Sequence, residues 1–255
     1  MSEAPVRVWL ERDGRLLRVR LARPPGNVLD AAMIAALEAA FARYADGGLQ
    51  AALLDHEGPH FCYGASVEEH LPEQCARMLA CFHALLQRLL EWPAPILVAM
   101  RGQCLGGGLE LACAGSLLYA APDARLGQPE IRLGVFAPAA SCLLPARIGQ
   151  GRAEELLYSG RSLDAATAGA WGLVAQVAED PTAAALAWFD AHLADKSASA
   201  LAWAVRAARA GFAARARRRL AEVERLYLDG LMRTADAVEG LRAFLEKRPP
   251  RWSHR

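Results

Sequence analysis

The chain has 255 residues, of which 54% are hydrophobic and 22% are charged. Its 29 basic and 28 acidic residues leave a formal net charge of +1, which provides no overall field for nucleic acid or an anionic membrane. Charge, glycine or proline interrupts every apolar stretch before it reaches a bilayer-spanning length. We therefore expect one large domain, or a domain with a smaller appendage, that binds neither nucleic acid nor membrane.

The six cysteines form no CxxC pair and no Cys/His spacing typical of metal ligands, so the sequence predicts no metal site. Several of them lie in apolar runs, where cysteine behaves as a small core residue. With no signal peptide, we expect a reducing, cytoplasmic location. Six arginines between Arg206 and Arg219 follow a helical pattern, which favours a solvated helix face over a phosphate or acidic-partner patch.

Alternating apolar residues at 6–10 and 16–21 flank Asp13-Gly14 and predict a β-hairpin. Asp30 is placed to cap a helix over 31–44. A short buried strand follows at 51–54, and residues 58–65 then form a loop.

The apolar spacing over 75–91 predicts a long helix, which Pro93 and Pro95 end. Buried strands follow at 96–100 and 117–120, separated by a glycine-rich turn and a helix. This alternation predicts parallel β/α units. From Asp180 the chain becomes helical and rich in alanine. We therefore divide it into an α/β core, 1–178, and a helical region, 179–255.

Three consecutive glycines, Gly106 to Gly108, precede the helix after the strand at 96–100. Each costs about 0.5–1 kcal/mol relative to alanine in regular structure, so close approach to the backbone must compensate. Amides at a helix N-terminus can then meet a ligand oxygen. Tight strand–helix packing is the alternative. The run matches neither the GxxxxGK[ST] nor the GxGxxG phosphate-binding pattern, which favours an oxyanion site.

Two glutamates are candidates for general acid–base chemistry. Glu110 falls in the first turn of the glycine-led helix, where complementing the helix dipole could also explain it. Glu130 follows Pro129 after another short strand, and alone it would be typical of a surface loop. Two acids that share a water repel each other, so we expect coupled titration with one raised pKa.

A third segment, Phe61-Cys-Tyr-Gly64-Ala65, follows the strand at 51–54. Gly64 permits an unusual backbone angle that would turn the Ala65 amide outward. One such amide is unremarkable. Two amides from separate strand ends, however, could hold a single carbonyl oxygen.

Taken together, Phe61-x-x-Gly-Ala65, Gly106-Gly-Gly-Leu-Glu-Leu111 and Gly127-Gln-Pro-Glu-Ile-x-x-Gly134 resemble the crotonase (enoyl-CoA hydratase/isomerase) superfamily, over nearly the whole chain. The resemblance implies an α/β fold, a spiral of ββα units followed by a C-terminal helical trimerisation region. It also implies a homotrimer, which often pairs into a dimer of trimers. The substrate would be an acyl-CoA thioester, with coenzyme A as part of the substrate and no separate cofactor.

The resemblance also assigns roles. It places an oxyanion hole at the amides of Ala65 and Gly107, and the two hydratase glutamates at Glu110 and Glu130. Lys247 from a neighbouring subunit would meet the CoA phosphates. The full set of substrate-binding residues that we expect is Tyr63, Gly64, Ser66, Val67, Gly106, Phe136 and Lys247. Tyr63 and Phe136 could shape the ring pocket, although core packing explains them equally well.

Within the superfamily, segments 63–70, 101–108 and 134–142 resemble members that hydrate a cyclic dienoyl-CoA. Ordinary enoyl-CoA hydratases carry Pro-Gly-x-Gly-Gly-Thr-Gln-Arg after the position of Gly134, whereas this chain has Val135-Phe-Ala-Pro-Ala-Ala-Ser-Cys142. Ser66 also stands at a usually acidic position. These departures indicate a pocket reshaped for a flat ring. The implied reaction converts cyclohexa-1,5-diene-1-carbonyl-CoA into 6-hydroxycyclohex-1-ene-1-carbonyl-CoA.

Three alternatives remain open at this point. They are a general enoyl-CoA hydratase or isomerase, a ring-opening hydrolase of 6-oxocyclohex-1-ene-1-carbonyl-CoA, and a non-catalytic relative that binds acyl-CoA or RNA. Both retained acids and the near-zero net charge weigh against the last. We expect His70 to be a surface residue at a helix start rather than a pocket residue.

Overall fold

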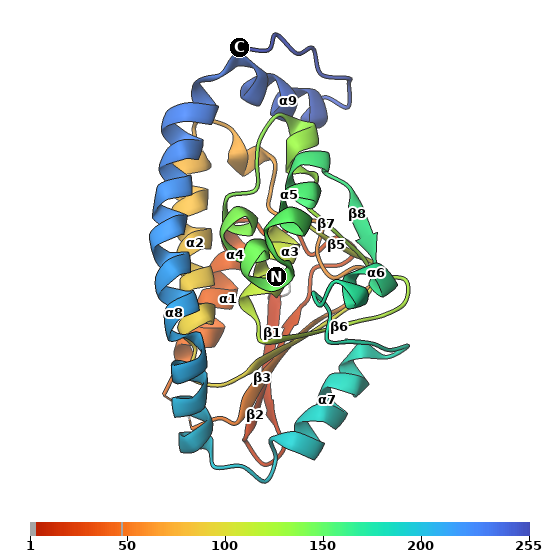
Figure 1. The fold of residues 1–255 in the computed structure, drawn as a ribbon, viewed down its shortest axis with the longest axis vertical. Coiled ribbons are helices and arrows are strands. Elements are labelled where there is room, and N and C mark those ends of the chain that lie inside the picture. The colour runs from red at the N-terminus through yellow and green to blue at the C-terminus, as the bar shows by residue number, and fades with distance from the viewer. Residues whose placement is uncertain (1–3, 47) are drawn as a thin grey trace.

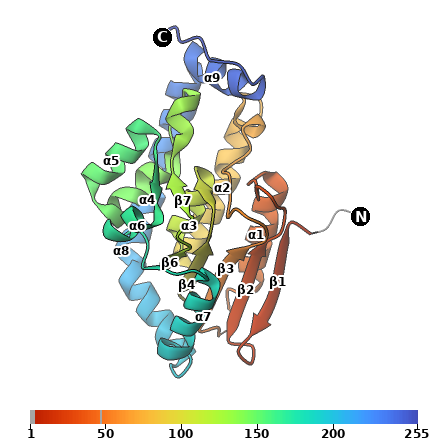
Figure 2. The ribbon, with the colours of Figure 1, turned by 90° about the vertical axis from the view of Figure 1, so that its right-hand side faces the viewer.

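A computed structural model describes residues 4–46 and 48–255. Its main sheet has the strand order β1-β2-β3-β4-β6-β9 (Figures 1 and 2). The six strands are β1 (Val6–Glu11), β2 (Leu16–Leu21), β3 (Ala51–His56), β4 (Ile96–Met100), β6 (Leu117–Ala120) and β9 (Gln176–Val177). The hairpin of β1 and β2 is antiparallel and the other neighbours are parallel, which confirms both predictions.

Helices cover both faces of this sheet. The inner face packs with α1 (Ala31–Arg43), α2 (Cys75–Glu91) and α3 (Gly107–Ala114), while α7 (Pro181–His192) covers the outer face. Alternate residues of β3 therefore enter different cores: Leu54 joins the larger cluster and Leu53 joins the smaller one with Phe189. Burial on both faces explains why β4 is apolar throughout rather than alternating.

The capping prediction for α1 is confirmed, because the Asp30 side chain accepts a hydrogen bond from the Met33 amide at 2.9 Å. The predicted bounds of α2 also agree with the structure. A second sheet of three short strands escaped prediction. It contains β5 (Gln103–Leu105), β7 (Arg125–Gly127) and β8 (Ser162–Asp164).

The segment between β7 and β9 is largely helical. It contains the 3-10 helix η2 (Pro129–Leu133), then α4 (Pro138–Ile148), α5 (Gln150–Ser159) and, after β8, α6 (Ala165–Ala170). The sequence had not predicted α4, whose alanine, proline and cysteine content gives little helical periodicity.

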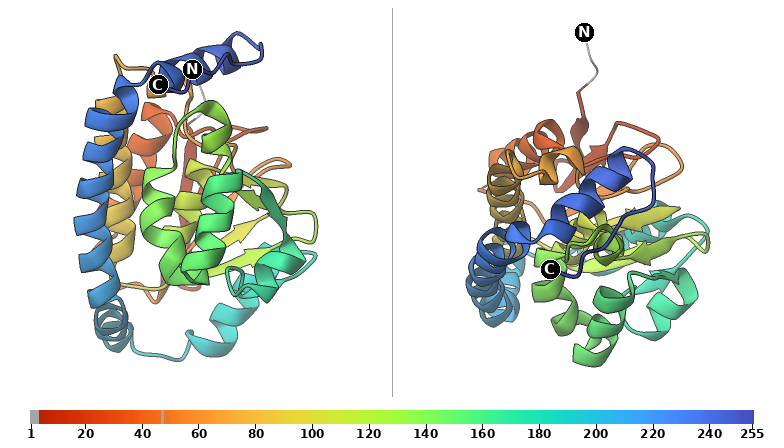
Figure 3. Two further views of the ribbon diagram at one scale, coloured as in Figure 1. Left: turned by 45° about the horizontal axis from the view of Figure 1, so that its top comes forward. Right: turned by 90° about the horizontal axis from the view of Figure 1, so that it is seen from above.

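The C-terminal region wraps the core. The long helix α8 (Ala198–Arg225) runs beside α2 and α4, and a π-helical turn η3 (Leu226–Gly230) and a 3-10 turn η4 (Leu231–Arg233) follow it. Finally α9 (Ala235–Leu245) crosses the top of the molecule and contacts both η2 and the 3-10 helix η1 (Glu68–His70) (Figure 3). No helix within the described residues is both long and apolar enough for a membrane span.

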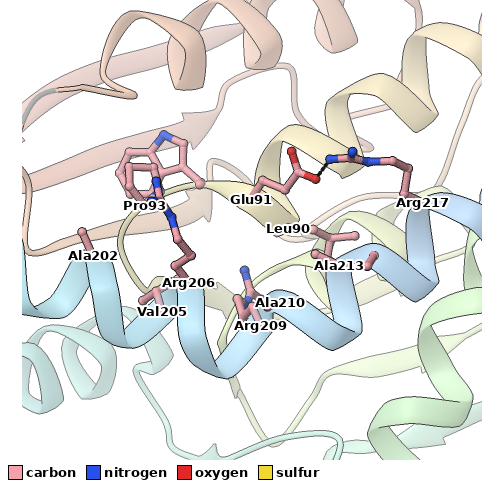
Figure 4. A pocket seen from close by; sticks show the side chains of 12 residues that line it. Leu90, Glu91, Pro93, Ala202, Val205, Arg206, Arg209, Ala210, Ala213 and Arg217 are labelled. Atoms are coloured by element: carbon pink, nitrogen blue, oxygen red, sulfur yellow. Dashed lines mark ion pairs between the residues drawn. The ribbon is translucent and has the colours of Figure 1, made fainter.

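The arginines of α8 lie mainly on its exposed face, as predicted, and the Arg217 guanidinium pairs with Glu91 (Figure 4). Arg209 is the exception. Its guanidinium is largely buried and donates hydrogen bonds to the carbonyls of Leu89, Ala114 and Gly115. It thereby satisfies carbonyls where α2 and α3 end, which is a structural role.

Candidate active site

A cavity of about 510 Å³ lies between α2, α3, η2 and α9. Together with the segment 63–70, five separate segments of the chain meet around it. Its lining residues are Tyr63, Gly64, Ala65, Val67, His70, Met78, Leu79, Phe82, His83, Leu105, Gly106, Gly107, Glu110, Pro129, Glu130, Arg132, Leu133, Val135, Pro138, Leu241 and Phe244.

The Ala65 amide is turned toward this cavity by a short parallel bridge with Leu29. Leu29 donates to the carbonyl of Gly64 and accepts from the amide of Ser66, both at 3.0 Å. In a parallel pairing of this kind, the residue between those two bonds points its own N–H to the other side. Gly64 adopts a φ of +110°, as expected from its place before this amide.

Gly107 is the first residue of α3, so its N–H has no partner within the helix and points out from the positive end of the helix dipole. A Cβ at Gly107 would lie 3.0 Å from the Ala65 amide nitrogen. The two predicted oxyanion amides are therefore neighbours, and the missing side chain keeps the space between them open. A Cβ at Gly106 would likewise lie 2.5 Å from Oε1 of Glu130. Because they lack Cβ atoms, Gly107 leaves room beside the Ala65 amide and Gly106 leaves room beside the Glu130 carboxylate. These glycines therefore do more than form a turn.

Glu110 is 4% exposed and lies in the first turn of α3. Its Oε1 accepts a hydrogen bond of 2.7 Å from the amide of Ala140. Ala140 is in the first turn of α4, whose N-cap residue, Ala137, provides no side-chain acceptor. Glu110 therefore acts as the missing N-cap of α4 from a different helix.

Glu130 enters the cavity from η2, beside Gly106. With its amide nitrogen oriented toward Glu130, the buried Gln128 side chain donates to both carboxylate oxygens, at 3.0 and 3.1 Å. The expectation that an isolated glutamate in a loop faces solvent does not hold here. The proline before Glu130 and the close-packed glycine turn bring it inside.

Burial raises the pKa of both acids. Burial raises the pKa of Glu110 to about 7, while hydrogen bonds from the amides of Ala140 and Ala139 oppose the rise. The pKa of Glu130 is raised well above its usual range, first by burial and then by the charge of Glu110. We had expected one raised pKa; both are raised, because both carboxyls leave water. The pair therefore retains a proton near neutral pH, so one member can accept a proton while the other donates one.

The structure brings most of the predicted residues together. Ala65, Gly107, Glu110 and Glu130 all line the cavity, as do Gly64, Gly106, Val67 and Tyr63. Tyr63 is 46% exposed, which places it at the mouth rather than in the core. Its side chain is therefore available to a ligand at the entrance.

Three predicted substrate-binding residues lie outside the lining. Ser66 uses its amide and carbonyl in hydrogen bonds to Leu29 and His70. Phe136 packs edge-on against Tyr227, with the ring centroids 5.2 Å apart, so core packing is its observed role. Lys247 is exposed beyond the end of α9. These three do not contact this chain's own cavity.

Sequence reasoning missed several cavity residues. His70 was expected on the surface, but it lines the cavity and its Nδ1 donates to the Ser66 carbonyl at 2.8 Å. His83 and Arg132 also line it. A signal for His83 existed, since it falls one helical turn after Leu79 on the apolar stripe of α2. Among residues 4–46 and 48–255 no cluster of three or more His, Cys, Asp or Glu side chains is placed to hold a metal ion.

The family model for enoyl-CoA hydratase/isomerase matches residues 11–255. The chain belongs to this family, the crotonase superfamily. It is 62% identical over 258 residues to a protein of Thauera aromatica, cyclohexa-1,5-dienecarbonyl-CoA hydratase, and both chains are covered completely. It is also 32% identical to a probable enoyl-CoA hydratase of Bacillus subtilis, over 90% of this chain and 92% of that one.

Solved structures agree with this assignment. An enoyl-CoA hydratase from Mycobacterium avium subsp. paratuberculosis superimposes with a TM-score of 0.85 and 26% identity, covering 98% of this chain and 99% of the other. The predicted α/β crotonase fold with a C-terminal helical region is confirmed.

Proposed function

We propose that this enzyme adds water to cyclohexa-1,5-diene-1-carbonyl-CoA, forming 6-hydroxycyclohex-1-ene-1-carbonyl-CoA. One observation carries the proposal: two neighbouring outward amides, Ala65 and Gly107, share a cavity with the buried carboxyl of Glu110 and the half-buried carboxyl of Glu130. The high identity to a hydratase named for this substrate supports the choice of a ring.

In the proposed reaction, the thioester oxygen accepts hydrogen bonds from both amides. The ionised glutamate takes a proton from water as the water oxygen bonds to a ring carbon. The electron pair moves through the conjugated system onto the thioester oxygen, which becomes an enolate. The protonated glutamate then gives its proton to carbon, so the sum is one water added. The amides bind the enolate more strongly than the neutral carbonyl, which lowers the barrier.

The cavity wall that faces the acyl group is apolar, with Met78, Leu79 and Phe82 from α2 and Leu241 and Phe244 from α9. Such a wall suits a hydrocarbon ring and keeps bulk water from the enolate. Coenzyme A is part of the substrate, and the proposed steps use no further cofactor.

The test is a comparison of substrates. Purified enzyme is given the cyclic dienoyl-CoA or crotonyl-CoA, and the products are separated by chromatography and weighed by mass spectrometry. We expect the cyclic substrate to be hydrated faster. Faster turnover of crotonyl-CoA would make this a general enoyl-CoA hydratase, a shifted double bond without added water an isomerase, and an opened ring from the 6-oxo thioester a hydrolase.

We also propose that the chain forms a homotrimer and that two such trimers can pair into a dimer of trimers, with residues 1–178 as the catalytic core and 179–255 as the region that assembles it. Exposed Trp203, Leu226 and Phe244 in that region support this. Lys247 would then reach the CoA phosphates of a neighbouring subunit. A cytoplasmic location is consistent with six unpaired cysteines. Light scattering of the purified enzyme tests the assembly.

A further inference from the structure

The C-terminal tail, residues 246–255, turns back along α9 (Figure 1). Two carboxylates of α9, about one helical turn apart, hold it there. Asp236 accepts hydrogen bonds from the amide and the hydroxyl of Ser253, at 2.6 and 2.8 Å. Glu239 accepts one from the amide of Arg251 at 2.8 Å. Chain ends are usually poorly ordered unless contacts of this kind tie them down. The residue between the two anchors is therefore fixed in place.

That residue is Trp252, and the far edge of its indole lies between η2 and α9. A Cβ added at Gly134, which ends η2, would lie 2.9 Å from Cζ3 of the ring. One added at Gly240, inside α9, would lie 2.9 Å from Cη2. Side-chain carbons do not pack so closely, so both glycines leave the space that the ring occupies. Trp252 as a whole remains 39% exposed, so simple burial of an aromatic side chain does not explain two glycines at its ring edge.

The glycine at the end of η2 is bonded to the main chain of Glu130. The amide of Val135 donates to the Glu130 carbonyl at 3.3 Å, and the amide of Gly134 donates to the same carbonyl. A short 3-10 helix such as η2 has weak internal hydrogen bonds, so its place depends on what packs against it. At its C-terminal end, that packing comes from α9 and Trp252.

The indole therefore touches two elements that meet at the cavity. One is η2, which carries Glu130, and the other is α9, which carries Leu241 and Phe244 of the apolar cavity wall. Trp252 does not itself line the cavity. Any effect that it has on a bound ligand must pass through the elements that it holds together.

We propose that the C-terminal tail sets the position of Glu130, with Trp252 as a positioning residue that holds η2 against α9. The inference rests on the proposed function for its effect on rate, because Glu130 is there a proton donor or acceptor. Loss of the indole edge leaves a gap between η2 and α9, and Glu130 is then no longer held at one place beside Gly106. Displacing a reacting group by about 1 Å can cost about 10²-fold in rate.

Hydrogen exchange tests the position of η2 without any turnover. Peptides that span 129–135 are followed by mass spectrometry in the full-length wild type and in Trp252→Ala. The amides that bond to the Glu130 carbonyl should exchange about tenfold faster in the variant, because local opening controls exchange. Arg251→Ala is the matched control. Arg251 is the exposed neighbour of Trp252, and its main-chain amide, which the substitution keeps, donates to Glu239. This variant should exchange like the wild type.

Kinetics then asks whether the ring acts through Glu130. In the wild-type background, Trp252→Ala should lower kcat by about 10- to 100-fold. In a Glu130→Gln background, the same substitution should lower the residual kcat by less than about threefold, because the group that it displaces is already inactive. Trp252→Phe keeps an aromatic ring and should recover part of the loss. A tryptophan that merely stabilised the fold would cost the same factor in both backgrounds.

Unchanged exchange over 129–135, an unchanged kcat, or an equal fall in both backgrounds overturns the proposal. If Trp252→Ala does not fold, Trp252→Phe and Asp236→Ala, which removes one anchor of the tail, carry the same comparison. Failure of the proposed function is recognised separately, since the wild type would then not hydrate the cyclic dienoyl-CoA. In that case kcat is measured with the enoyl-CoA that the enzyme does turn over. If it turns over none, exchange over 129–135 alone judges the tail.

Discussion

The cavity has two unlike walls. The reaction wall consists of Ala65, Gly107, Glu110 and Glu130, and the acyl wall consists of Met78, Leu79, Phe82, Leu241 and Phe244. Along the acyl wall, Met78, Leu79, Phe82 and Leu241 are buried where an amphipathic helix places residues toward a core, and Phe244 is 53% exposed. Along the reaction wall, the chain buries carboxyls and starts a helix with glycine, both of which cost stability.

The comparison separates residues that stabilise the fold from residues that the proposed reaction requires at a cost in stability. Residues of the acyl wall stabilise the fold and the bound ring by the same apolar contacts. In the reaction wall, both acids already accept hydrogen bonds, Glu110 from Ala140 and Glu130 from Gln128, whereas the amides of Ala65 and Gly107 gain a partner only when a ligand oxygen arrives. Changes to the reaction wall should therefore cost rate and can increase stability.

The largest effect should follow Glu110→Gln and Glu130→Gln. Each variant loses a proton acceptor or donor while keeping its shape, so kcat should fall by about 10²–10⁴. Binding of the CoA ester should change little. Steady-state kinetics with the cyclic dienoyl-CoA, beside calorimetry with an unreactive ester, measures both. Wild-type kcat in either variant would remove that glutamate from the mechanism.

The next largest effect should follow Gly107→Ala. Its Cβ would lie 3.0 Å from the Ala65 amide nitrogen and crowd the proposed oxyanion hole. We expect kcat/KM to fall by about 10²–10³, as on loss of one oxyanion donor. Gly211→Ala is the control, because a Cβ there meets nothing within 4 Å in the long helix α8. Equal rates for the two variants would argue against these amides.

The smallest effect is on stability, and it depends on pH. A carboxyl with a raised folded-state pKa destabilises the fold above its unfolded pKa. For Glu110 the penalty is absent below 4.5, grows up to about pH 7 and is constant beyond. The free energy of unfolding of Glu110→Gln, taken relative to that of the wild type, should therefore be higher at pH 8 than at pH 4.5 by on the order of 3 kcal/mol. Urea unfolding at fixed protein concentration measures this.

The exposed Glu73→Gln serves as the control for that measurement and should change little at either pH. If the stability of Glu110→Gln relative to the wild type does not rise between pH 4.5 and pH 8, Glu110 is not held out of water.

The sequence predicted the hairpin, the parallel sheet and the bounds of α2, because apolar periodicity and proline breaks are local signals. It missed α4 and the three-stranded sheet. Strands of three residues are too short to show alternation, and α4 has Pro145 within it and little amphipathy. The miss matters, since the N-terminus of α4 is what holds Glu110.

The residues of the reaction wall could be predicted because consecutive glycines, and acids among apolar residues, are unfavourable for folding alone and are therefore recognisable in the sequence. His70 and His83 were not, because a histidine in a helical pattern has the same appearance in a core, on a surface or in a pocket. Their environment depends on contacts with segments far along the chain. Glu224, the partner of His83, lies 141 residues away.

Because Glu110 caps α4, one carboxylate serves both the proposed chemistry and the architecture. Whenever Glu110 takes up a proton, its hydrogen bond from the Ala140 amide weakens. The first turn of α4 would therefore be less firmly capped during that step of the catalytic cycle. A descendant of this protein that gave up hydration could not simply discard the acid. It would first need another acceptor for the Ala140 amide. Glu110 could therefore remain in the sequence after the hydratase activity has been lost.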